Sequence, residues 1–253
     1  MMDNVAWITG ASSGFGAACA RRLAAGGWGL ILSARRADRL EGLRREIGDK
    51  APVHILPLDV RDRQGVTAAV SGLPAAFRPV TLLVNNAGLA LGLEKAHEAD
   101  LEDWDRMVDT NIKGLIYMTR ALLPQMVAAD RGYIINIGSV AGNWPYPGGN
   151  VYGGTKAFVK RFSQNLRSEL IGTAVRVTNI EPGLAETEFS LVRFKGDAEK
   201  AAAVYEGMKP LSAEDIAEIV WWLVNLPPHV NVNSLEVMPV AQAWSFFAVH
   251  RDT

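Results

Sequence analysis

The sequence has little of what marks a secreted, membrane-bound or nucleic-acid-binding protein. Cys19 is its only cysteine, which excludes an internal disulfide and suits a reducing compartment. No apolar run approaches the ~20 residues that a membrane-spanning helix requires, and the N-terminus shows no basic segment followed by an apolar core. The 26 basic and 27 acidic residues nearly balance, so no polyanionic partner is expected. The sequence therefore predicts a cytoplasmic protein without a nucleic-acid or membrane partner.

Metal-ligand patterns are missing as well. The histidines are His54, His97, His229 and His250. They stand at no metal-ligand spacing from one another, so we predict no metal site. What the sequence does have is 49% hydrophobic and 21% charged residues, which is typical of a globular chain that buries a core.

Short apolar runs alternate along the chain with longer segments whose apolar residues recur at helical spacing. The predicted strands cover residues 5–9, 28–33, 53–58, 81–84, 133–137, 175–180 and 234–238, and helical patterns include 37–47, 101–127 and 151–170. Strands buried on both faces by crossover helices have such continuous Val, Ile and Leu runs. No linker or repeat marks a boundary. The sequence predicts one α/β domain over 1–253, a Rossmann-type, doubly wound parallel sheet of about seven strands flanked by helices.

A glycine-rich turn follows the first predicted strand and opens a helix. Gly10, Gly14 and Gly16 are spaced G-x-x-x-G-x-G. Glycines permit a tight turn and let the backbone approach a pyrophosphate, whose charge the N–H groups and helix dipole stabilise. A simple turn is the alternative interpretation. The position of this glycine-rich motif directly after the first strand favours a dinucleotide site.

Two arginines, Arg35 and Arg36, follow the second predicted strand. An NAD-specific enzyme usually has an acid there, whereas guanidinium groups favour the 2′-phosphate of NADP. The alternative is that both arginines lie on a solvated helix start. Asp59, beyond the third strand, is a candidate acceptor for the adenine amino group, and an N-cap of the next helix is its alternative role.

Tyr152 and Lys156 stand four positions apart at the start of a helical pattern, so they share one face. A free tyrosine hydroxyl has a pKa near ~10, and a nearby ammonium favours the phenolate. We therefore expect Lys156 to lower the pKa of Tyr152. Ser139 follows the fifth strand and can donate a hydrogen bond to a substrate oxygen, while Asn111 is suited to hold a water that links Lys156 to solvent.

Taken in order, these motifs resemble the short-chain dehydrogenase/reductase family over essentially the whole chain. The matching motifs are T-G-x-x-x-G-x-G, N-N-A-G, Y-x-x-x-K and P-G-x-x-x-T. Two single residues match as well, Asn111 and Ser139. The resemblance implies an oxidoreductase that uses NADP(H), commonly as a homotetramer. It implies a catalytic tetrad of Asn111, Ser139, Tyr152 and Lys156, with Tyr152 transferring the proton. From the residues and the resemblance together, the predicted cofactor-binding residues are Thr9, Gly10, Ser12, Ser13, Gly14, Phe15, Gly16, Arg35, Arg36, Asp59, Val60, Asn86, Ala87, Gly88, Tyr152, Lys156, Pro182, Gly183 and Thr187.

Longer stretches, including 85–92, 142–146, 148–153 and 192–197, resemble the NADP-dependent 3-hydroxy acid dehydrogenase subgroup. That subgroup oxidises serine and L-allo-threonine and reduces malonic semialdehyde. Reductases of sulfoacetaldehyde, which form isethionate, resemble it too. A loop and helix insertion near 184–210 is expected to cover the substrate. The expected substrate-binding residues are Ser139, Asn143, Tyr146, Tyr152 and Arg193.

Arg193 is the candidate partner for an anionic substrate, because a guanidinium suits a carboxylate or sulfonate. A surface arginine that closes an ion pair is the alternative. Two further classes of function stay open. One is a non-catalytic NADP-binding sensor, for which a broken tetrad would be expected. The other is an assembly protein that uses the apolar stretch 220–226.

Overall fold

A seven-stranded parallel sheet organises the computed structural model, which describes residues 4–244 and residue 249. The strand order is β3-β2-β1-β4-β5-β6-β7. The strands are β1 (Val5–Thr9), β2 (Gly29–Ala34), β3 (Val53–Pro57), β4 (Leu82–Asn85), β5 (Gly132–Ile137), β6 (Val175–Pro182) and β7 (Ser234–Val237). The order reverses at β1, which confirms the predicted doubly wound Rossmann-type sheet.

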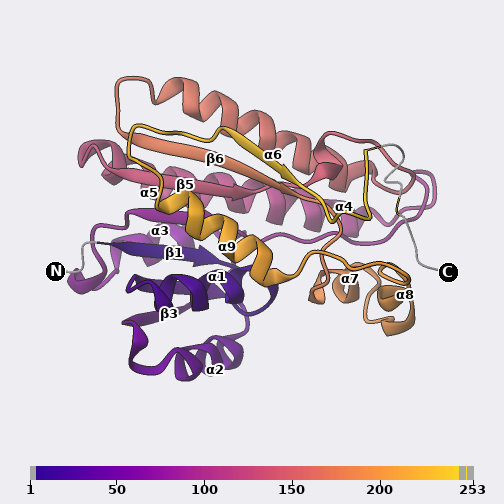
Figure 1. Cartoon of the computed structure of the whole chain (residues 1–253), viewed down its shortest axis with the longest axis horizontal. Coiled ribbons are helices and arrows are strands. Elements are labelled where there is room, and N and C mark those ends of the chain that lie inside the picture. The colour runs from indigo at the N-terminus through magenta and orange to yellow at the C-terminus, as the bar shows by residue number, and fades with distance from the viewer. Residues whose placement is uncertain (1–3, 245–248, 250–253) are drawn as a thin grey trace.

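Helices cover both faces of the sheet (Figure 1). They are α1 (Gly14–Ala25), α2 (Ala37–Ile47), α3 (Arg63–Ser71), α4 (Leu101–Val108), α5 (Leu115–Ala128), α6 (Asn150–Glu169), α7 (Glu188–Arg193), α8 (Ala198–Ala203) and α9 (Ala213–Val224). Among the described residues, no helix is long and apolar enough to cross a membrane.

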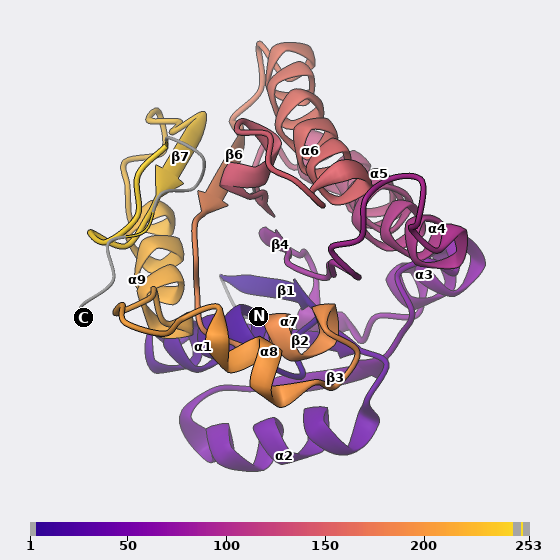
Figure 2. The ribbon, with the colours of Figure 1, turned by 90° about the vertical axis from the view of Figure 1, so that its right-hand side faces the viewer.

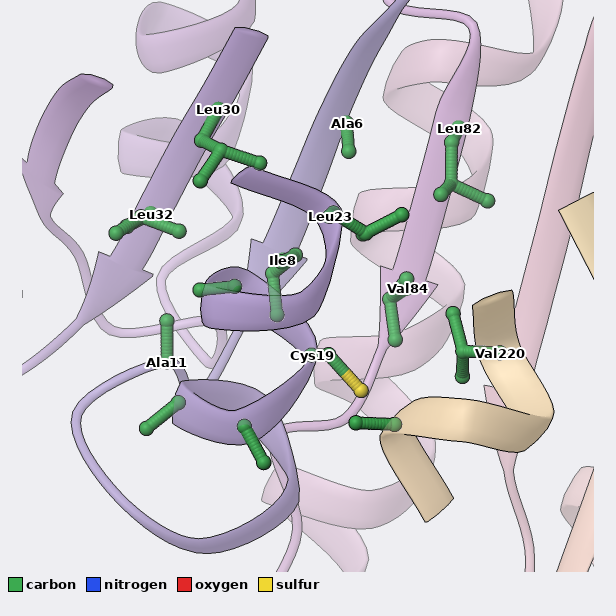
Figure 3. Packing of buried hydrophobic residues seen from close by; sticks show 14 of the residues in the cluster. Ala6, Ile8, Ala11, Cys19, Leu23, Leu30, Leu32, Leu82, Val84 and Val220 are labelled. Carbon is green, nitrogen blue, oxygen red and sulfur yellow. The ribbon is translucent and has the colours of Figure 1, made fainter. Parts of the chain in front are cut away.

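The apolar runs of the strands are continuous because both faces of the sheet are buried. Side chains alternate along β1, so Ile8 belongs to the core under α1, α2 and α9, whereas Trp7 belongs to the core under α3, α5 and α6. Figure 3 shows Ile8 in the first of these cores, together with Leu23 of α1 and Val220 of α9. The two cores fix the strand ends that carry the site.

A π-helical turn interrupts the helix predicted over 101–127. α4 ends at Val108, the wider turn covers Asp109–Gly114, and α5 begins at Leu115. A π turn adds a residue and changes which side chains face inward, and Asn111 within it is 2% exposed. Apolar periodicity does not register a local backbone shift of this kind, which is why the sequence predicted one uninterrupted helix.

α7 and α8 lie across the carboxyl ends of the strands (Figure 2). Both belong to the segment 184–210, which leaves β6 at this edge. β6 continues to Pro182, beyond the predicted end at 180, because Glu181 and Pro182 pair with Glu236 and Val237 of β7. Ligands of doubly wound sheets bind at the carboxyl edge, so the functional question concerns the space beneath α7.

Candidate active site

A cavity of about 570 Å³ lies at the carboxyl ends of the strands. A volume of this size suits a small molecule or cofactor. The predicted site residues that line it are Gly10, Ser12, Ser13, Gly14, Phe15, Arg35, Arg36, Asp59, Val60, Asn86, Ala87, Gly88, Ser139, Tyr146, Tyr152, Lys156, Pro182, Gly183, Thr187 and Arg193. One continuous space therefore joins the glycine turn, the arginine pair and the Tyr–Lys pair.

The glycine turn needs its glycines for two reasons. Gly10 and Gly14 have φ angles of 65° and 52°, a left-handed conformation that favours glycine. A Cβ on Gly10 would also lie 2.9 Å from the Cα of Ala87. Ser13 is the N-cap of α1 but makes no side-chain cap hydrogen bond, so its hydroxyl leaves the first N–H groups of α1 uncapped. Such a helix start is suited to a phosphate.

Thr9 and Gly16, both predicted to contact the cofactor, are not among the residues that line the cavity. The hydroxyl of Thr9 accepts hydrogen bonds from the backbone N–H groups of Asn86 (3.0 Å) and Ala87 (2.9 Å). A Cβ on Gly16 would lie 2.6 Å from both Asn86 Nδ2 and Gly10 O. Thr9 and Gly16 therefore support the conformation of the turn without lining the cavity themselves. Asn86 itself donates to Thr9 O at 2.9 Å and so joins the ends of β1 and β4.

The arginine end of the cavity contains an acid that the sequence reasoning missed. Arg36 Nη2 donates to the hydroxyls of Ser12 (3.0 Å) and Ser13 (2.9 Å). Its Nη1 donates to Glu188 Oε2 at 3.1 Å. Glu188 directly follows Thr187 of the P-G-x-x-x-T motif, and this position could have indicated that Glu188 lies near the cofactor site. Nothing in the sequence indicates that Glu188 reaches Arg36.

Asp59 lines the cavity and is not an N-cap. The N-cap of α3 is Asp62, whose carboxylate accepts from the N–H groups of Gln64 and Gly65, so the alternative role for Asp59 is wrong. Asp59 instead accepts from the guanidinium of Arg61, with 2.6 Å between Arg61 Nη2 and Asp59 Oδ2. The hydrogen bond from Arg61 holds the pKa of Asp59 below its ordinary value, which keeps this acceptor ionised.

Tyr152 and Lys156 lie one turn apart on α6 and are both buried, at 7% exposure each. Lys156 Nζ lies 5.8 Å from the centre of the Tyr152 ring and donates to Ile137 O at 2.8 Å. This contact ties the ammonium to the end of β5, from which Ser139 follows. The hydroxyl of Ser139 accepts from Ala141 N at 3.1 Å. The fold thus brings three of the four predicted tetrad residues to the cavity wall.

Asn111 lies behind that wall. Its side chain accepts from Leu89 N (2.9 Å) and donates to Leu89 O (2.8 Å) and Thr155 Oγ1 (3.0 Å). Its Oδ1 lies 3.2 Å from the point that a Cβ on Gly88 would occupy, and Lys156 Nζ lies 3.6 Å from the same point. Asn111 therefore braces the loop after β4 beside Lys156, and its predicted water link stays a prediction.

The pKa of Tyr152 shifts in the direction opposite to our expectation. Burial raises the pKa of its hydroxyl well above 10, although the hydrogen bond with Ser139 and the charge of Arg193 lower it by less. Burial likewise lowers the pKa of Lys156 to about 8. Because both groups are removed from water, the pKa of each shifts toward its neutral form, although Lys156 stays mostly charged below pH about 8. The expected lowering of the pKa of Tyr152 is therefore not found, because burial outweighs the groups that lower it, and the separate effect of Lys156 stays a prediction.

Arg193, the last residue of α7, lies beside Tyr152. Its Nη2 donates to the hydroxyl of Tyr146 at 2.8 Å, and its Nε donates to Gly92 O at 3.3 Å. The guanidinium carbon lies 5.5 Å from the Tyr146 ring centre and 5.6 Å from that of Tyr152. The Phe189 ring packs 5.7 Å from the Tyr152 ring. α7 therefore supplies both a cation and an apolar wall to the Tyr152 end of the cavity.

Asn143, the remaining predicted substrate contact, does not line the cavity. Its amide donates to Glu181 Oε2 (2.7 Å) and Glu236 Oε2 (2.8 Å), and its oxygen accepts from Lys160 Nζ (2.8 Å). These partners come from β6, β7 and α6, so Asn143 is held beside β6 and β7. Its neighbour Trp144 is 38% exposed and also bonds to Glu236. The structure therefore gives Asn143 a role in packing the β6–β7 edge.

Gln242 is a cavity residue that the sequence did not indicate. It is 7% exposed, and its Oε1 accepts from Leu184 N at 2.8 Å. A Cβ on Gly183 would lie 2.3 Å from that oxygen. Gln242 thus fixes the chain where it leaves β6. No motif marks it, because its position depends on how the chain after β7 returns to the site.

Comparison with known proteins identifies the family. Residues 4–197 match the family described as short chain dehydrogenase. The chain is 58% identical over 245 residues to the NADP-dependent 3-hydroxy acid dehydrogenase of Salmonella typhi, covering 96% of this chain and 98% of that one. It is 55% identical over 252 residues to the sulfoacetaldehyde reductase of Chromohalobacter salexigens, covering 99% and 100%.

A solved structure agrees. The closed form of serine dehydrogenase complexed with NADP+ superposes with a TM-score of 0.93 at 54% identity, covering 98% of this chain and 99% of that one. The predicted resemblance is confirmed by all three comparisons. The chain belongs to the short chain dehydrogenase family.

Proposed function

We propose that this protein is an NADP(H)-dependent oxidoreductase that interconverts a small 3-hydroxy acid, or β-hydroxy amino acid, and its aldehyde or keto form. The observation that carries the proposal is the cavity that has a buried phenol, Tyr152, close to a guanidinium, Arg193. The phenol suits proton exchange at a carbonyl oxygen, and the guanidinium suits an acid group on the same small molecule. The names of the similar dehydrogenases support the same reaction.

The residues of this chain fit NADP(H). Gly10 and Gly14 leave the turn without side chains where a pyrophosphate needs backbone N–H groups. Arg35 and Arg36 line the cavity where a 2′-phosphate requires charge. Lys156 is the residue proposed to hold the nicotinamide ribose. When bound, the nicotinamide accepts or supplies the hydride of the reaction.

In the reducing direction, Tyr152 donates its proton to the carbonyl oxygen of the substrate, and Ser139 donates a hydrogen bond to the same oxygen. The raised pKa of Tyr152 keeps the phenol protonated for this step. Lys156 carries positive charge beside the tyrosinate that results, and Asn111 positions the loop next to Lys156. Arg193 binds the distal anion, and Tyr146 orients the guanidinium. The segment 184–210 is proposed to cover the substrate, with α7 over the cavity.

A second candidate is the NADPH-dependent reduction of sulfoacetaldehyde to isethionate. A sulfonate is a compact anion like a carboxylate, and Arg193 suits both. The similarity to a sulfoacetaldehyde reductase over nearly the whole chain favours this alternative equally. The family resemblance further supports a homotetramer. The single cysteine suits the reducing environment of the cytoplasm.

The test is a steady-state panel that follows NADPH oxidation. Malonic semialdehyde is compared with sulfoacetaldehyde in reduction, and serine with 3-hydroxyisobutyrate and L-allo-threonine in oxidation. We expect turnover with at least one member of this panel, and the larger kcat/KM assigns the carboxylate or the sulfonate. Binding of NADPH without turnover of any substrate would indicate a sensor instead.

Tyr152→Phe tests the mechanism within the same assay. The substitution keeps the ring and removes the ionisable oxygen. We expect kcat to fall by about 10²–10⁴-fold, as for a lost general acid/base, with NADPH binding largely retained in a fluorescence titration. Turnover within a few-fold of wild type would contradict the role of Tyr152.

A further inference from the structure

Arg36 is already engaged with an anion of the protein. Its Nη1 donates to Glu188 Oε2 at 3.1 Å, and the other oxygen of Glu188 accepts from Arg39 Nη1. One carboxylate therefore bridges two guanidinium groups at the end of the cavity proposed for the adenosine ribose. All three side chains are partly exposed, at 42% for Arg36, 43% for Arg39 and 39% for Glu188.

The two arginines differ in their access to a ligand. Arg36 and Glu188 line the cavity, whereas Arg39, one turn further along α2, does not. Glu188 is the first residue of α7 and follows its N-cap, Thr187. A molecule that enters this end of the cavity therefore meets Glu188 together with Arg36, while Arg39 contacts the carboxylate from outside.

Binding of a 2′-phosphate at Arg36 conflicts with this ion pair. A phosphate carries about two negative charges near neutral pH. If it bound Arg36 while Glu188 kept its place, like charges would lie within a few ångströms of one another. Arg36 therefore has to exchange the carboxylate for the phosphate, and Arg39 is positioned to keep Glu188 paired when it does.

We propose that Glu188 is a specificity-determining residue whose carboxylate competes with the 2′-phosphate of NADP(H) for Arg36. This rests on the proposed use of NADP(H). NAD(H) has a hydroxyl at that position and binds without breaking the Arg36–Glu188 pair. Glu188 therefore lowers the affinity for NADP(H) but not the affinity for NAD(H). It thereby reduces the preference for NADP(H) over NAD(H).

Glu188→Gln is the test, because it keeps the size of the side chain and its hydrogen-bonding oxygen but removes the charge. Loss of an exposed ion pair changes an equilibrium constant by up to about fivefold. We expect the Kd for NADPH to fall about two- to fivefold at low ionic strength, with the Kd for NADH unchanged. Raising the salt to about 0.5 M screens exposed charges and should shrink the gain.

Two further proteins serve as controls. In an Arg36→Ala background, adding Glu188→Gln should no longer change the Kd for NADPH, because the contested cation is gone. Glu46→Gln removes a comparable exposed ion pair, in which Glu46 Oε1 lies 2.7 Å from Arg21 Nε. Glu46 is on the same helix as Arg39, and neither Glu46 nor Arg21 lines the cavity. This substitution should leave both dissociation constants unchanged. Retained NADH binding shows that each variant is folded.

The outcomes separate this inference from the cofactor assignment. Tighter NADPH binding in Glu188→Gln, absent from the Arg36→Ala background, supports the competition. A wild-type preference for NADPH with an unchanged or weaker NADPH affinity in Glu188→Gln refutes the competition alone. An equal gain for both cofactors refutes it too. Equal wild-type affinity for NADPH and NADH refutes the proposed cofactor and, with it, the competition.

Discussion

Arg193→Ala removes the cation that lies closest to the proposed reaction centre on the α7 side. The guanidinium carbon is 5.6 Å from the ring centre of Tyr152, and the hydroxyl of Tyr146 holds Nη2 at 2.8 Å. A substrate whose carbonyl oxygen meets Tyr152 therefore has room for a short chain before its acid group reaches Arg193. Alanine leaves that acid group without its partner in a partly buried cavity.

The size of the effect follows from the interaction that is lost. A hydrogen bond to a charged group contributes about 1.5–3 kcal/mol, so losing one lowers kcat/KM for an anionic aldehyde about 10- to 150-fold. Arg193 also lowers the pKa of Tyr152, though by less than burial raises it. That contribution affects charged and neutral substrates alike and cancels in a ratio of their specificity constants.

The assay is therefore the ratio of kcat/KM for malonic semialdehyde to kcat/KM for propanal. We expect the ratio to exceed one in wild type, to fall in Arg193→Ala, and to recover in part in Arg193→Lys, which restores charge without the planar fork. Tyr146→Phe keeps the guanidinium but removes the hydroxyl that orients it, so its loss should be smaller. A ratio unchanged by Arg193→Ala excludes Arg193 as the anion partner. A wild-type ratio near one rejects an acid substrate altogether.

Three further predictions concern the cofactor, a buried charge and the glycine turn. Neutral replacement of both Arg35 and Arg36 should reduce the preference for NADPH over NADH about tenfold or more in Kd; an unchanged preference would contradict their role. Below pH about 8 the ammonium of Lys156 is buried while charged, and between pH about 8 and 10.5 only the folded state loses that proton. The free energy of unfolding of wild type, measured by urea denaturation, should therefore rise with pH over this window relative to that of Lys156→Met. A pH-independent difference would argue against this shift. Gly16→Ala should lower the free energy of unfolding by about 1–3 kcal/mol through overpacking, whereas Gly42→Ala in α2, where a Cβ meets nothing within 4 Å, should raise it by up to about 1 kcal/mol; equal effects would contradict the packing argument.

Local patterns of the sequence determined the fold class and the chemical centre. The helix 37–47 and the first strand have the predicted bounds, because apolar periodicity reports directly which faces are buried. The glycine turn was predictable because only glycine tolerates its positive φ and close contacts. The spacing of Tyr152 and Lys156 placed both on one face of α6, since a helix repeats every 3.6 residues.

The tertiary structure alone decided the environment of each group. Asn143 was predicted near the substrate, but its partners on β6 and β7 hold it outside the cavity. The pKa of Tyr152 rises because the whole fold removes it from water, which no neighbouring residue in the sequence indicates. Glu188 reaches Arg36 across 152 positions of the chain. Burial and charge pairing depend on partners from distant segments, so they are fixed only when the strands and helices assemble.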